Sequence, residues 1–278
     1  MFTSIVVALD LEATGDRALP FAASLAALGE LDVELLTVSS IGMPTAVDSF
    51  ELERRASAHR LVDYSCAVLR ADDAGATIVE YLASRPGALL AMGTTAKGPV
   101  AGHLFGSVSE HVLGHIASPV LVAGPRTAGH RLVSPTMIAC VGDSDRVEAA
   151  APPIVSWLRT FGGEACVATV QPSGASGDIV DARERVRQLA ERLTAIGAGH
   201  PAQRILRGDD PVASLEDLAH GFADPVFAAV SARWTDGRFH RHSVTRNLVR
   251  HSTWPVLVVP AQPAIADQTP TQHLDAAC

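Results

Sequence analysis

The sequence lacks the features of a membrane protein, a secreted protein and a general nucleic-acid binder. No uncharged apolar run reaches the roughly 18 residues that a transmembrane helix needs. The first residues, FTSIVVALD, have neither the basic start nor the long apolar core of a signal peptide. Acidic residues exceed basic ones, and the formal charge of −8 disfavours binding to nucleic acid or to an anionic membrane. These absences predict a cytoplasmic protein with no nucleic-acid and no membrane partner.

Cysteine is scarce, and its spacing excludes a zinc site and a disulfide framework. Cys66, Cys140, Cys166 and Cys278 form no C-x-x-C pair, and the first three lie in apolar stretches. This pattern is typical of reduced structural thiols. The chain also has no P-loop, no kinase motif and no Ser-His-Asp order of a hydrolase.

The chain contains the same motif twice. GHLFGSVSEHVLGHIASPVLVAG includes Ser107 and Pro119, and RFHRHSVTRNLVRHSTWPVLVVP includes Ser243 and Pro255, each 136 residues later. A repeat of this length in 278 residues indicates two duplicated domains of roughly 130 residues. We expect a first domain over 1–125, a linker over 126–134, a second domain over 135–261 and a disordered tail over 262–278.

Each copy alternates apolar runs with helical segments. Strands are expected over 4–10, 32–39, 66–73, 88–93 and 119–123, and in the second copy over 137–143, 164–170 and 225–231. Helices are expected over 14–29 with Pro20 in the first turn and Gly29 as the stop, 48–63, 76–85, 106–116 and 178–197. The last of these has one apolar face and a stop at Gly197, the face consisting of Ile179, Val186, Leu189, Leu193 and Ile196. Such alternation predicts an α/β fold with two repeated doubly wound, Rossmann-like domains and mainly parallel five-stranded sheets.

A loop of the first copy has the chemistry of a phosphate site. In open α/β sheets ligands bind beyond the carboxyl ends of the strands, where Asp10, Val38 and Met92 are expected. The glycine-rich loop GTTAKGPVAGHLFGSVS then enters a helix near Gly106 and Ser107. A helix N-terminus attracts anions, and Gly106 is expected to allow close approach and conformations closed to other residues. The alternative is that Ser107 only caps the helix and the glycines only shape the loop.

The whole chain resembles a tandem universal stress protein. Nucleotide-binding members of that family share a glycine, two residues, a glycine, nine residues, then glycine with serine or threonine. This sequence has Gly93, two threonines, Ala96 in place of the second glycine, nine residues, and Gly106-Ser107. The resemblance implies ATP as the ligand, with a divalent metal such as Mg²⁺ on its phosphates. It implies nucleotide contacts from Ala8, Leu9, Asp10, Val38, Met92, Gly93, Gly106, Ser107, Val108 and Ser109.

The second copy is expected to keep the fold and to have lost ordinary ATP binding. Asp143 is matched to Asp10, whereas Ser231 replaces Gly93 and His242 replaces Gly106 in a loop two residues shorter. Trp234 is expected to fill space that a nucleotide needs. In the family the last strands of two domains pair, so Val120–Val122 and Val256–Val259 are expected to join the halves, with a homodimer as a further possibility.

Two other groups of residues have simpler readings. His111 and His115 are four apart on a helix, a spacing that can chelate a metal, but no third ligand accompanies them. The acid pairs Asp72-Asp73 and Asp209-Asp210 precede helices, and capping explains them without catalysis.

The resemblance favours an ATP-binding stress-response protein in which nucleotide in the first domain alters the choice of a regulatory protein partner. One alternative is a weak ATPase or phosphotransfer enzyme, for which no general base is identified. The other is a structural dimerisation module that binds no nucleotide.

Overall fold

The computed structural model describes residues 1–11, 15–42, 45–94, 106–142, 147–174, 179–231 and 243–260. The first half consists of β1 (Ser4–Ala8), the 3-10 helix η1 (Gly15–Ala18), α1 (Leu19–Gly29), β2 (Asp32–Ser39), α2 (Thr45–Ala58), β3 (Tyr64–Arg70), α3 (Ala74–Ala83), β4 (Ala88–Gly93), α4 (Ser107–His115) and β5 (Val120–Ala123). The second half consists of β6 (Pro135–Cys140), α5 (Val147–Phe161), β7 (Glu164–Gln171), α6 (Ile179–Ala195), β8 (Ala202–Arg207), α7 (Pro211–Ala219), β9 (Asp224–Ser231), α8 (Val244–His251) and β10 (Val256–Pro260).

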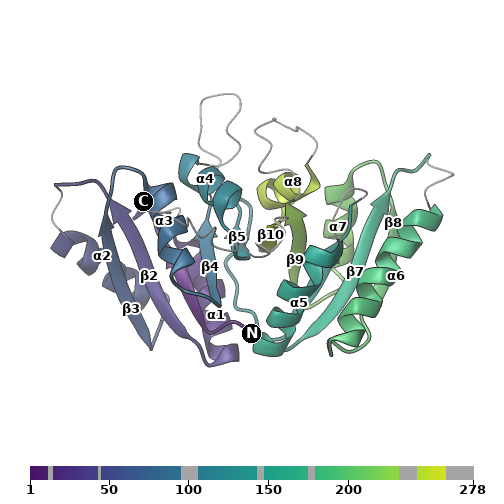
Figure 1. Ribbon diagram of the computed structural model, residues 1–278, viewed down its shortest axis with the longest axis horizontal. Coiled ribbons are helices and arrows are strands. Elements are labelled where there is room, and N and C mark those ends of the chain that lie inside the picture. The colour runs from purple at the N-terminus through teal and green to yellow at the C-terminus, as the bar shows by residue number, and fades with distance from the viewer. Residues whose placement is uncertain are drawn as a thin grey trace, which may run out of the picture.

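The two halves share one ten-stranded sheet, with the strand order β3-β2-β1-β4-β5-β10-β9-β6-β7-β8 (Figure 1). Within each half the strands are parallel and helices cover both faces of the sheet, as the alternation of strands and helices predicts. The α/β, doubly wound fold is therefore present twice. In the part of the chain that the structure describes, no helix has the length and apolar character to span a membrane.

The antiparallel pairing of β5 with β10 joins the halves. Val122 pairs with Val256, and Val120 pairs with Val258, as the resemblance to universal stress proteins implied. Gly124 follows β5 at this junction, where an added Cβ would lie only 1.8 Å from the Val249 carbonyl oxygen. The close approach of the second half therefore requires a residue without a side chain at this position.

On one face of the sheet, a single apolar core continues from the first half into the second. Phe2 and Phe161 stack with ring centroids 5.8 Å apart, although they come from opposite halves. Gly29, at the end of α1, lies against α5 of the second half, since an added Cβ would be 3.1 Å from Phe161 and Thr160. The residue that ends α1 in a left-handed conformation is Glu30, with φ 51°, and not Gly29 as expected.

Several boundaries differ from the sequence-based expectations. Helix α2 ends at Ala58, earlier than expected, and β3 covers 64–70, so the acid pair that follows lies outside the strand. Pro20 lies in the first turn of α1, as expected. Gly197 has φ +88° just after α6, which confirms it as the stop, but Ile196 is 39 % exposed and does not belong to the buried face.

The segment between the halves contains no helix or strand over 126–134. Its Val133 and Ser134 N–H groups donate to the Asp224 carboxylate at 2.8 and 3.0 Å, which ties the segment to the start of β9. Residues 262–278, expected to be a disordered tail, lie outside the described residues.

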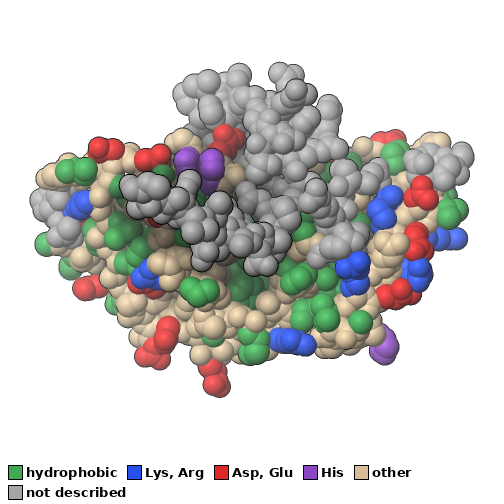
Figure 2. Space-filling model, in the orientation of Figure 1, with side chains coloured by type: hydrophobic (Ala, Val, Ile, Leu, Met, Phe, Trp, Pro, Cys, Tyr) green, Lys and Arg blue, Asp and Glu red, His purple; other side chains and the backbone are tan. Residues whose placement is uncertain are grey.

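Charge is divided unequally between the halves. Of the 22 Lys and Arg residues, 15 follow residue 125, whereas the 30 Asp and Glu residues are divided almost evenly, so the first half carries most of the net negative charge. Basic side chains are accordingly more frequent over the second half, on the right in Figure 2, than over the first.

Candidate functional site

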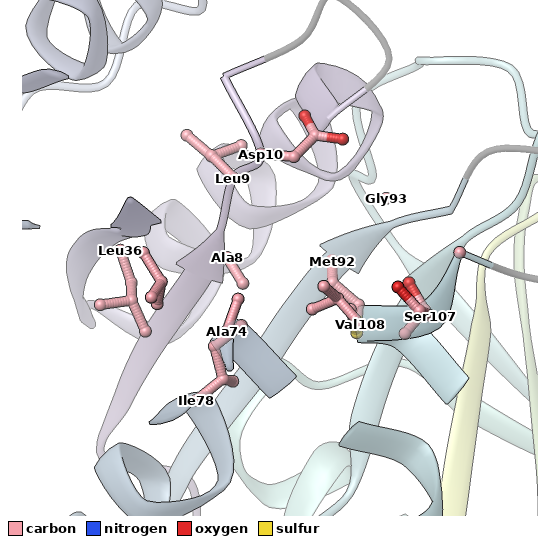
Figure 3. Close-up of a pocket in the computed structure, with 13 residues that line it drawn as sticks. Ala8, Leu9, Asp10, Leu36, Ala74, Ile78, Met92, Gly93, Ser107 and Val108 are labelled. Atoms are coloured by element: carbon pink, nitrogen blue, oxygen red, sulfur yellow. The ribbon is translucent and has the colours of Figure 1, made fainter. Parts of the chain in front are cut away.

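The first half contains a cavity of ≈ 240 Å³ at the carboxyl ends of β1, β2 and β4 (Figure 3). All ten residues expected to contact a ligand lie in its lining, together with Leu36, Ala74 and Ile78, which the sequence analysis did not include. The expected residues come from four separate segments of the chain, and the fold brings them together because parallel strands end at the same edge of the sheet.

Hydrogen bonds to the backbone hold the end of β1 in place. The buried Thr37 hydroxyl donates to the Leu9 carbonyl oxygen at 2.8 Å, and the Leu9 N–H donates to Leu36 at 2.9 Å. Asp10 follows directly and is exposed at the cavity. The next residue, Leu11, has φ +60°, a left-handed conformation that is uncommon for a leucine and turns the chain sharply. These contacts fix where the Asp10 carboxylate leaves the sheet.

A buried arginine supports the same turn from the other side. Arg55 of α2 is 3 % exposed, and its guanidinium donates to the Leu11 carbonyl oxygen and pairs with Asp16. It also pairs with Glu51 at 2.9 Å. The pKa of Glu51 is lowered to about 2 by its hydrogen bonds to Arg54 and Arg55. Arg55 therefore connects α2 to the segment after Asp10.

The start of α4 differs from both readings of the sequence. The N-cap is Gly106, and Ser107 is the first helical residue, so the proposal that Ser107 caps the helix is wrong. Gly106 has φ −56° and ψ 151°, values that any residue adopts, so it is not needed for an unusual conformation. An added Cβ at Gly106 would meet nothing within 4 Å among the described residues. Its effect is to leave the cavity open beside the first-turn N–H groups, which have no partner within the helix.

Helices α3 and α4 form the walls of the cavity and meet at a glycine. An added Cβ on Gly75 would lie 2.7 Å from the His111 Cβ, so the absence of a side chain sets the separation of the two helices. Asp73 caps α3 by accepting from the Ala76 N–H at 3.0 Å, as expected for this acid pair. That hydrogen bond holds the pKa of Asp73 below its usual range.

The cavity has an apolar end and a polar end. Figure 3 shows Ala8, Leu36, Ala74 and Ile78 together on one side, between β1, β2 and α3. Asp10 and Ser107 lie on the other side, with Met92 between the two groups. This arrangement suits a ligand with a flat apolar part and a polar, hydrogen-bonding part.

A hydrogen bond and the strand pairing of the second half correct two of the expected matches between the copies. Thr169 donates to the Val141 carbonyl oxygen at 2.7 Å, just as Thr37 donates to Leu9, so the position of Asp10 corresponds to Gly142 and not to Asp143. Strand pairing shows the second correction. Gly93 pairs with Ala123 and Val230 pairs with Val259, so Gly93 corresponds to Val230 and the following loop is one residue shorter, not two.

His111 and His115 stack at 4.3 Å, and the described residues contain no group of three or more metal-ligating side chains. Cys66 is exposed, contrary to the apolar surroundings expected for it, whereas burial raises the pKa of the Cys166 thiol. Ala96, Asp143, Trp234 and His242 lie outside the described residues.

The sequence contained a signal for Thr37, the residue that positions the end of β1. The dipeptide Thr-Val occurs at 37–38 and again at 169–170, in the same place in both copies. Ala74 and Ile78 had no such signal, because their place in the lining depends on how α3 packs over the sheet.

Comparison with known proteins supports the fold and the family. Residues 1–124 match the model of the universal stress protein family. No curated protein matches the chain. A universal stress protein from Archaeoglobus fulgidus DSM 4304 has 16 % identity and a TM-score of 0.62, with 93 % of this chain and 98 % of that chain covered.

Two further solved structures have similar descriptions. A putative universal stress protein from Pseudomonas aeruginosa UCBPP-PA14 has 16 % identity and a TM-score of 0.58, with 93 % of each chain covered. A universal stress protein solved in complex with cAMP has 25 % identity and a TM-score of 0.38, and covers 44 % of this chain and 96 % of its own. Residues 1–124 therefore resemble the universal stress protein family in sequence, and the second half of the chain repeats the α/β fold.

Proposed function

We propose that the first half binds ATP in the cavity beside β1, β4 and α4, and that the bound nucleotide controls a stress-response role. The base and ribose would lie against Ala8, Leu9, Asp10 and Val38. The phosphates would follow Met92 and Gly93 towards the start of α4, where Gly106, Ser107, Val108 and Ser109 line the cavity.

The observation that supports this proposal most is the shared lining of one cavity by all ten residues. Those residues range from Ala8 to Ser109 and meet in a space of ≈ 240 Å³. The apolar side suits a base, and the Asp10 carboxylate suits ribose hydroxyl groups, which donate hydrogen bonds to it. The start of α4 suits an anion, since its free N–H groups and the helix dipole both favour negative charge.

The residues present also fit the phosphate part of the ligand. The open space beside Gly106 leaves room for phosphate oxygens next to the first turn of α4. The Ser107 and Ser109 hydroxyl groups add donors at the same place. Mg²⁺ bound with ATP would be held mainly by the phosphates, because Asp10 is the single carboxylate among the described lining residues.

A regulatory effect requires that the nucleotide binds one conformation better than another. Helix α4 follows the phosphate end of the cavity and contacts α8 of the second half through Glu110 and Arg246. Ligand-dependent movement of α4 would therefore change the surface shared by both halves. In this proposal that surface selects a protein partner in the cytoplasm.

The experiment is to purify the full chain gently and identify bound nucleotide by mass spectrometry, then to titrate ATP by calorimetry. Gly106→Glu places a negative charge at the phosphate end and is expected to weaken ATP binding at least tenfold. Ser107→Ala removes one donor and should weaken binding less. His115→Glu adds the same charge to α4 at an exposed position beyond the cavity, and it should leave ATP affinity within twofold of the wild type.

Each contrary result has a clear meaning. No bound nucleotide and no heat with ATP would contradict the proposal and favour a structural pairing module. Release of phosphate at a constant rate from the wild type, lost in Gly106→Glu, would instead favour the weak ATPase.

A further inference from the structure

The second half has a cavity of its own at the corresponding place. Its volume of ≈ 220 Å³ is close to that of the first cavity. It lies at the carboxyl ends of β6, β7 and β9 and beside the starts of α7 and α8. The described residues of the second half thus retain a cavity at the place that corresponds to the first.

Most of the apolar wall is retained. Val38, Ile78 and Val108 of the first cavity correspond to Val170, Leu215 and Val244 of the second. Smaller side chains line the floor, because Ala168 takes the place of Leu36 and Ala229 takes the place of Met92. Proline side chains of 172 and 211 line the second cavity as well. The space remains suited to a flat apolar group.

The polar groups differ in a way that disfavours phosphate. Ser243 caps α8 by accepting from the Arg246 N–H at 3.3 Å, whereas α4 has no side-chain cap. The Thr245 hydroxyl, at the position of Ser109, donates to the Val230 carbonyl oxygen at 3.1 Å. The Thr245 proton is thus used on the backbone, whereas the Ser243 oxygen is held by the cap of α8.

The second cavity presents hydrogen-bond acceptors. Gly142 replaces the Asp10 carboxylate, and Asp209 brings a carboxylate from the other side, with one oxygen accepting from the Ser173 N–H at 3.0 Å. The Thr169 hydroxyl proton is used on Val141, so its oxygen can only accept. Among the lining residues that the structure describes, none is basic. A phosphate would meet a like charge there, whereas an N–H or O–H group would find an acceptor.

We infer that the second half binds an uncharged, mainly apolar ring compound that carries an N–H or O–H donor and no phosphate. Asp209 accepts from its donor, and the ring lies between Val170, Leu215 and Val244. This site is separate from the nucleotide cavity proposed for the first half, and neither depends on the other.

The test uses the full chain and two probes, adenosine and AMP, which differ by one phosphate group. Binding is followed by the backbone amide signals of Val141, Gly142 and Thr245 in two-dimensional NMR. Adenosine is expected to shift these signals, with an affinity at least tenfold higher than that of AMP. Benzamide, a second uncharged ring compound with an N–H donor, is expected to shift the same signals.

The internal repeat supplies matched variants. Val244→Trp fills the second cavity from a position that is 36 % exposed, so the fold should tolerate it. It is expected to remove the adenosine-induced shifts at Val141 and Gly142. Val108→Trp makes the same change in the first cavity and is expected to leave those shifts in place. Near-identical spectra for residues remote from each cavity check that both variants are folded.

Two results would overturn the inference. One is AMP or ATP shifting these signals as strongly as adenosine does, because the site would then accept phosphate. The other is the absence of any shift with adenosine and benzamide at millimolar concentration. Loss of ATP binding in the first half alone would contradict the proposed function and leave this inference standing.

Discussion

Glu110 and Arg246 occupy equivalent positions in the two halves and form an ion pair with each other, with 4.0 Å between their charged atoms. Each is the third residue after the serine of its own copy of the motif, and their side chains are only 17 % and 15 % exposed. A symmetric pairing of two identical first halves would place glutamate against glutamate here. The divergence to opposite charges favours the pairing of the first half with the second.

Reversal of one charge in this pair is expected to destabilise the protein. Glu110→Arg places two guanidinium groups together and should cost between ~1 and 3 kcal/mol, intermediate between exposed and buried ion pairs. The double variant Glu110→Arg with Arg246→Glu should recover most of that loss. Urea denaturation of the four proteins measures the coupling. Equal stability of the single and double variants would show that the pair contributes nothing to the junction.

Thr37 is expected to act through the position of Asp10. Thr37→Val removes the hydroxyl that donates to the Leu9 carbonyl oxygen in a buried setting, at a cost of ~1–3 kcal/mol. On the proposed function it should also weaken ATP binding, because the end of β1 loses its anchor. The matched control is Thr169→Val, which removes the equivalent bond in the second half and should cost similar stability without reducing ATP affinity.

Substitution of Gly75 by alanine is expected to destabilise the protein. Alanine normally stabilises a helix relative to glycine by about 1 kcal/mol. Here the new Cβ would lie 2.7 Å from the His111 Cβ, and overpacking of this kind costs ~1–3 kcal/mol, so we expect net destabilisation and a wider gap between α3 and α4. A Gly75→Ala protein with a melting temperature above the wild type would contradict this. His111→Gly in the same chain should relieve part of the loss, since it removes the contacted atom.

Because of Tyr81, we expect the folded protein to lose stability at alkaline pH. Burial and its hydrogen bond to Glu34, at 2.7 Å, raise the pKa of Tyr81 to about 12 from its ordinary value of 10. Its contribution is therefore present in full below pH 10 and is lost as pH rises from 10 towards 12. Denaturation midpoints measured across this range should fall more steeply for the wild type than for Tyr81→Phe. Parallel pH profiles would show that Tyr81 ionises as freely in the folded state as in the unfolded one.

The sequence predicted the fold well because local patterns specify local structure. Alternating apolar runs and helical segments predict a parallel sheet covered on both faces, and the resemblance to a known family implied the pairing of β5 with β10. The sequence-based prediction was wrong at the end of one helix. Ile196 fits the apolar spacing of α6 yet lies beyond the helix and is exposed.

The sequence by itself determined the duplication and the type of each main element, because local spacing specifies strands and helices. The resemblance to a known family indicated the ten residues that line one cavity. Tertiary structure decided the register between the copies, so that Gly142, and not Asp143, lies where Asp10 lies in the first half. It also decided which glycine matters for packing and that the described residues of the second half line a cavity of their own. These depend on contacts between segments distant in sequence, such as Gly75 with His111, and no local pattern encodes such contacts.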